Sequence, residues 1–119
     1  MSADAAVAVR SRYQARLGRR VTVVRDLGSL RGPPRGRMGL PLRLHWSGPS
    51  PVFDLGVPYL RRWLYQIVLR EASRPEDLTG YLDRDMLIAL WPDLYLPRGV
   101  RQAWEELHPR LRAAAARAA

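Results

Sequence analysis

The sequence predicts a small α+β protein, in which an N-terminal antiparallel β element of two or three strands is followed by a compact bundle of about four short helices. Three observations lead to this class. A β-branched run, "VTVV", and an alternating segment, "LRLHW", predict strands, and apolar residues recur with helical spacing after residue 57. A chain of 119 residues has room for one core of modest size.

The first predicted element is a helix over residues 3–17. This segment is rich in alanine, its Val9, Tyr13 and Leu17 recur every four residues, and Gly18 follows at a position where helices often end. The β-branched run that comes next predicts a strand at about residues 20–25.

The segment "GSLRGPPRGRMGLP" is predicted to be a mobile loop outside any helix or sheet, because it contains four glycines and three prolines. After it, Leu42, Leu44 and Trp46 alternate with polar residues, "SGPSP" supplies a turn, and "VFDL" follows. This pattern predicts a β-hairpin.

The second half of the chain predicts a series of helices. Pro58 has the backbone angle that suits a first helical turn, and it precedes a wide apolar face. That face consists of Tyr59, Leu60, Trp63, Leu64, Ile67 and Val68. Ser73 and Glu76 have the spacing of a capping box, which predicts a short helix from Arg74 to about Tyr81.

Two further helices are predicted. Asp83 is a suitable N-cap for the first, and Pro92 is expected to end it. The second starts at Pro97 and has one apolar face, formed by Val100, Ala103, Trp104, Leu107 and Leu111. Pro109 is expected to kink or stop this helix, and "RLRAAAARAA" is expected to fray or to continue as an exposed helix.

These elements divide the chain into a basic N-terminal segment over residues 1–56, with a helix, a mobile loop and a hairpin, a helical domain over 57–109, and an Ala/Arg-rich tail over 110–119. All twenty basic residues are arginine, which partly reflects GC-rich codons. Their distribution is more informative: the net charge is +8 over residues 1–50, −2 over residues 51–109 and +3 over residues 110–119. Codon usage gives no reason for acidic residues to be concentrated in the second half.

The sequence argues against an enzyme. It contains no cysteine, and its two histidines, His45 and His108, are not part of a recognisable catalytic constellation or metal site. We therefore expect no catalytic residue, no metal and no cofactor. No segment approaches the roughly 20 apolar residues of a membrane span, and no signal peptide is evident, so the sequence predicts a cytoplasmic protein without a membrane partner.

The basic N-terminal half predicts binding to the nucleic-acid backbone. Arginine side chains match the geometry of phosphate groups, and flexible segments such as "RGPPRGR" often become ordered on nucleic acid. The predicted nucleic-acid-binding residues are Arg19, Arg20, Arg31, Arg35, Arg37 and Arg43. The alternative is that this loop is solvated and that its arginines reflect composition alone.

The helical half predicts contact with a protein partner or a second copy of the chain. Aromatic residues are enriched at the centres of protein interfaces, and Trp91, Tyr95 and Trp104 are the predicted partner-binding residues. The helix after Pro97 is poorly suited to bind DNA as a recognition helix, because Glu105 and Glu106 lie on its solvent face and would repel the phosphate backbone. The sequence thus favours a regulatory or accessory nucleic-acid-binding protein; the alternative is a protein-only adaptor or inhibitor, such as an antitoxin-like neutraliser.

Overall fold

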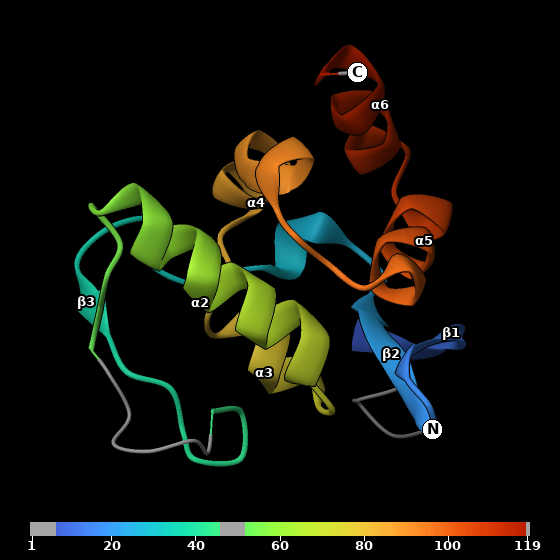
Figure 1. Ribbon diagram of the computed structural model, residues 1–119, viewed down its shortest axis with the longest axis horizontal. Helices are drawn as coiled ribbons and strands as arrows, with labels where there is room; N and C mark the ends of the chain where they lie inside the picture. The colour runs from blue at the N-terminus through green and yellow to red at the C-terminus, as the bar shows by residue number, and fades with distance from the viewer. Residues whose placement is uncertain (1–6, 46–51, 119) are drawn as a thin grey trace.

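The computed structural model describes residues 7–45 and 52–118, which form two antiparallel strand pairs and five α-helices (Figure 1). The strands are β1 (Ala8–Arg16), β2 (Arg19–Val24), β3 (Arg37–Met38) and β4 (Phe53–Asp54). The helices are α2 (Pro58–Glu71), α3 (Pro75–Thr79), α4 (Arg84–Leu90), α5 (Arg98–Leu107) and α6 (Pro109–Ala118), with two 3-10 turns at Leu27–Ser29 and Trp91–Asp93. The predicted α+β class is confirmed.

The hairpin of β1 and β2 shows that the helix predicted over residues 3–17 was wrong from Ala8 onward; residues 3–6 lie outside the described residues. The two strands pair from Ala8↔Val24 to Arg16↔Arg19, and Gly18 has a φ of 79° in the two-residue turn that joins them. A spacing of four residues fits a strand as well as a helix, because strand side chains repeat every second residue. The strict alternation of "VRSRYQAR" was the better signal, while the predicted strand at 20–25 is confirmed as β2.

The predicted hairpin between "LRLHW" and "VFDL" was also wrong. β4 pairs instead with β3, which lies inside the segment expected to stay outside any sheet. Residues 42–44 form a turn, because the carbonyl of Pro41 accepts hydrogen bonds from the amides of Leu44 and His45. As a result Leu44 is buried while Leu42 is 67% exposed. Trp46 and the "SGPSP" turn lie outside the described residues.

The helix predicted from Pro58 is confirmed as α2, but its buried face differs from the predicted one. The buried residues are Leu64, Tyr65, Ile67, Val68 and Leu69. Tyr59 and Trp63 are 63% and 39% exposed, so both aromatic rings reach the surface of the helix.

The cap of α3 is one residue away from its predicted position. Asp77, and not Glu76, accepts hydrogen bonds from the amides that precede the helix, which belong to Ser73 and Arg74. Pro75 occupies the first helical position, where its missing amide proton is tolerated. Asp83 caps α4 as predicted by accepting a bond from the amide of Met86.

Helix α5 begins after Pro97 and ends at Leu107, before Pro109, as predicted, and the segment that follows is a helix, α6, most of whose residues are exposed. Leu111 and Ala114 of α6 are buried, which contradicts the expectation that this segment has almost nothing to bury. Apolar side chains from Val21 to Leu111 belong to one buried cluster, which therefore includes residues from both halves of the chain. Trp91 and Trp104 lie within it and are fully buried.

One face of the hairpin packs closely on α5. Gly99 in the first turn of α5 lies against the backbone of Gln14, where a Cβ atom would overlap the Gln14 carbonyl. At the other end of α5, His108 Nε2 donates to the carbonyl of Val24 over 2.7 Å. Burial lowers the pKa of His108, so the imidazole is neutral in this contact at pH 7.

We predict that Gly99→Ala destabilises the protein by about 1–3 kcal/mol, because either the helix or β1 must move to make room for the methyl group. Gly39→Ala is the matched control, since no heavy atom lies within 4 Å of its Cβ position. That control should be neutral or slightly stabilising. Chemical denaturation of both variants measures the difference, and equal stabilities would show that α5 does not constrain β1.

Candidate functional site

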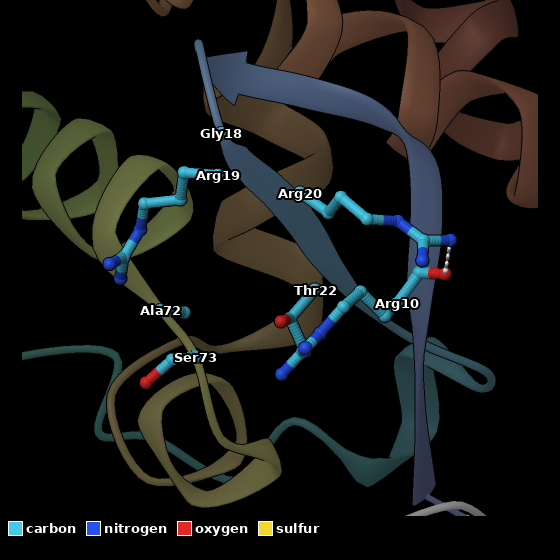
Figure 2. A pocket seen from close by; sticks show the side chains of 7 residues that line it. All are labelled: Arg10, Gly18, Arg19, Arg20, Thr22, Ala72 and Ser73. Carbon is cyan, nitrogen blue, oxygen red and sulfur yellow. Dashed lines mark hydrogen bonds between the residues drawn. The ribbon is translucent and has the colours of Figure 1, made fainter.

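A groove with a basic lining runs between the hairpin and the connection from α2 to α3 (Figure 2). It consists of two neighbouring hollows of about 230 and 320 Å³, which share Arg10, Thr22 and Ser73. We call it the basic groove, and its arginines are Arg10, Arg19, Arg20, Arg25 and Arg74. Among residues 7–45 and 52–118, no acidic residue lines either hollow.

The hairpin positions one wall of the basic groove. Arg10 of β1 and Thr22 of β2 are directly paired, so both side chains leave the sheet on the same face. Figure 2 shows these two side chains close together, facing the Ala72–Ser73 segment across the hollow. The hairpin therefore presents a guanidinium and a hydroxyl to the same space.

Four arginines of the basic groove, Arg10, Arg19, Arg20 and Arg74, form no ion pair with a carboxylate of the described residues. Arg19 donates to the main-chain carbonyl of Glu71, and Arg20 donates to the carbonyls of Ser11 and Arg10. These bonds hold the guanidinium groups in place but do not neutralise them. Among the described residues, the arginines that do form such ion pairs include Arg12, Arg16, Arg43, Arg70, Arg84 and Arg101.

The opposite wall is held by the buried carboxylate of Asp77. This carboxylate accepts bonds from the amides of Ser73 (3.0 Å) and Arg74 (3.1 Å), and it pairs with the guanidinium of Arg43. Burial alone would raise the pKa of Asp77, but the bonds from Arg43 and the two amides together lower it below its ordinary value of 3.8. The ionised carboxylate thus fixes the two residues that line the groove.

The predicted nucleic-acid-binding arginines are divided by the structure. Arg19 and Arg20 line the basic groove, whereas the guanidinium of Arg43 is engaged by Asp77. Arg31, Arg35 and Arg37 are exposed; the first two precede β3, and Arg37 is its first residue. In Figure 1, β3 and the hairpin lie on opposite sides of α2, so Arg37 is separated from the basic groove.

Sequence reasoning missed Arg10, Arg25 and Arg74. The alternation of arginine with less polar residues in β1 was a usable signal for Arg10, since it places every second side chain on one face. Arg74 had no such signal, because it lies in the acidic half and reaches the groove only through the tertiary structure.

The predicted partner-binding residues also lie in different environments. Trp91 and Trp104 are core residues, and Trp91 is fixed further by a 2.8 Å bond from its Nε1 to Glu105 and by the guanidinium of Arg101 over its ring. Their side chains offer no surface to a partner in this fold. Tyr95 is 87% exposed, so the partner prediction now rests on Tyr95.

Comparison with known proteins identifies no relative. No protein-family model matches the chain, and neither the curated proteins nor the solved structures gave a significant match. Within residues 7–45 and 52–118, no helix is both long and apolar enough to cross a membrane. The same residues contain no group of three or more histidine or acidic side chains with the arrangement of a metal site.

The state of Asp77 predicts how stability depends on pH. The pKa of this carboxyl is lower in the folded protein than in the unfolded chain. At pH values above the pKa of the unfolded chain, the ionised carboxylate therefore stabilises the fold. This stabilisation is lost as the pH falls through the pKa of the folded protein. At pH 7, Asp77→Asn should destabilise the protein by about 1–3 kcal/mol, because the amides and Arg43 lose a charged acceptor. The unfolding free energies of the unmodified protein and of Asp77→Asn, measured from pH 7 down to pH 2, should become more similar below about pH 3.8. If the difference in unfolding free energy between the two proteins does not depend on pH, the ionised carboxylate of Asp77 does not stabilise the fold in this way.

Proposed function

We propose that this chain is a non-enzymatic regulatory or accessory protein that binds nucleic acid through its basic N-terminal half, with the basic groove as the principal contact. The observation that carries the proposal is the accumulation of guanidinium groups along two adjoining hollows, whose lining contains no acidic side chain from the part of the chain that the structure describes. Among these, Arg10, Arg19, Arg20 and Arg74 form no ion pair with a carboxylate of the described residues.

The chemistry of the lining suits phosphate groups. Arginine binds phosphate oxygens through two parallel N–H donors, and hydroxyl groups are also common donors to the nucleic-acid backbone. Thr22 and Ser73 supply such hydroxyls between the arginines. An elongated lining of this kind fits a repeating polyanion better than a single small anion, because more than one hollow carries the charge.

The helical half is proposed to contact a protein partner or a second copy of the chain, with Tyr95 as the exposed aromatic residue. Helix α5 does not need to touch nucleic acid in this scheme. Its acidic residues are already engaged, since Glu105 accepts from Trp91 and Glu106 pairs with Arg12. If no nucleic acid binds, the protein-only adaptor or inhibitor becomes the better description of the chain.

The salt dependence of binding tests the proposal. A labelled random oligonucleotide should bind with an affinity that falls linearly with salt on a logarithmic plot, at a slope of about −0.9 per phosphate on a duplex and −0.7 on a single strand. The double variant Arg10→Ala/Arg74→Ala should flatten the slope by about one to two units on either form. It should also weaken all sequences alike, because backbone contacts carry no sequence information.

The matched control is Arg35→Ala/Arg37→Ala, which removes the same charge from exposed positions outside the basic groove. If the salt slope changes less for this control than for Arg10→Ala/Arg74→Ala, the result supports binding in the basic groove. A larger change would move the binding surface to the loop before β3, and an undetectable affinity at low salt for both forms of nucleic acid would overturn the proposed function.

A further inference from the structure

Another hollow, of about 400 Å³, lies outside the basic groove and combines an aromatic ring with positive charge. Its lining includes His45, Trp63, Arg16, Arg70 and Glu71, with Leu44 and Ile67 as its apolar members. We call it the aromatic hollow. Trp63 is 39% exposed there, unlike Trp91 and Trp104, which are fully buried.

The ring of Trp63 is held in a fixed orientation. It makes T-shaped contacts with Phe53, at 5.1 Å between ring centroids, and with His45, at 5.6 Å. Phe53 is fully buried, so Trp63 rests on a rigid support. A preorganised aromatic surface loses little side-chain entropy when a planar ligand stacks on it.

The charge around the aromatic hollow is also defined. Arg16 and Arg70 both pair with the single carboxylate of Glu71, at 3.4 and 3.2 Å, and so one positive charge remains uncompensated within this trio. Both arginines are substantially exposed, with side-chain exposures of 59% and 42%. The hollow therefore favours a ligand that is planar and accompanied by negative charge.

The aromatic hollow adjoins the basic groove. Arg16 and Glu71 line the first, while Arg19 and Ala72, their near neighbours in the chain, line the second. The guanidinium of Arg19, in the lining of the basic groove, bonds to the carbonyl of Glu71, which lines the aromatic hollow. A strand whose phosphates lie in the basic groove thus has the aromatic hollow within reach of an adjacent base.

We propose that the ligand is single-stranded nucleic acid, with phosphates in the basic groove and an unpaired base stacked on Trp63 in the aromatic hollow. This inference rests on the proposed function and specifies its ligand. Bases in a duplex are paired and stacked within the helix, whereas those of a single strand can stack on aromatic side chains with little regard to sequence. Arginine next to the ring strengthens such a site, because it neutralises the phosphate that accompanies the base.

The test compares the full-length protein with Trp63→Leu, which keeps an apolar side chain against Phe53 but removes the indole. Affinity for a labelled 12-nucleotide single strand of mixed sequence should fall roughly 5- to 100-fold, the range expected for loss of one stacked base. Affinity for an abasic strand of the same length, and for the duplex, should not change. Trp63→Phe should recover most of the lost affinity, because it restores a ring.

Tyr59→Leu is the matched control, because Tyr59 is exposed one turn earlier on α2 and does not line the aromatic hollow. It should leave all affinities unchanged. Equal losses for Trp63→Leu on the abasic and normal strands would overturn the stacked base while leaving phosphate binding intact. The inference also fails if the normal strand binds Trp63→Leu as tightly as the unmodified protein. Absence of binding to every strand, single or double, would instead reject the proposed function itself.

Discussion

The candidate site depends on the hydrogen bonds and the ion pair of the buried Asp77 carboxylate. It binds the main-chain amides of Ser73 and Arg74, and these same two residues line the basic groove. Its charge is balanced by Arg43 from a distant part of the chain, so the connection between α2 and α3 is fixed by a charged, hydrogen-bonded centre. One arginine of the basic half is thereby used to build the groove wall and is not available to a ligand.

The two faces of the hairpin make different contacts. One face packs on α5, where Gly99 permits close approach to Gln14 and His108 bonds to the end of β2. The other face directs Arg10 and Thr22 toward the groove. The hairpin arginines Arg12 and Arg16 instead pair with the helix carboxylates Glu106 and Glu71, which separates them from Arg10 in the groove.

The sequence was sufficient for the α+β class and for the starts of α2, α4 and α5, because proline and a capping aspartate act locally. It failed for β1, where spacing by four fits two kinds of structure, and for the cap of α3, where Glu76 and Asp77 each lie three residues after a possible N-cap. Arg19 and Arg20 of the groove were predictable from charge. Arg74 and Trp63 were not, because their positions follow from how α2 and α3 pack against the hairpin.

We propose that phosphate-bearing ligands bind between the hairpin and the α2–α3 connection. Titration of the ¹⁵N-labelled protein with a short single strand, followed by amide chemical shifts, tests it most directly. We expect the largest shift changes at Arg10, Thr22 and Ser73, with smaller changes near Trp63. Changes confined to the segment from Arg31 to Arg37, or to the surface around Tyr95, would contradict it.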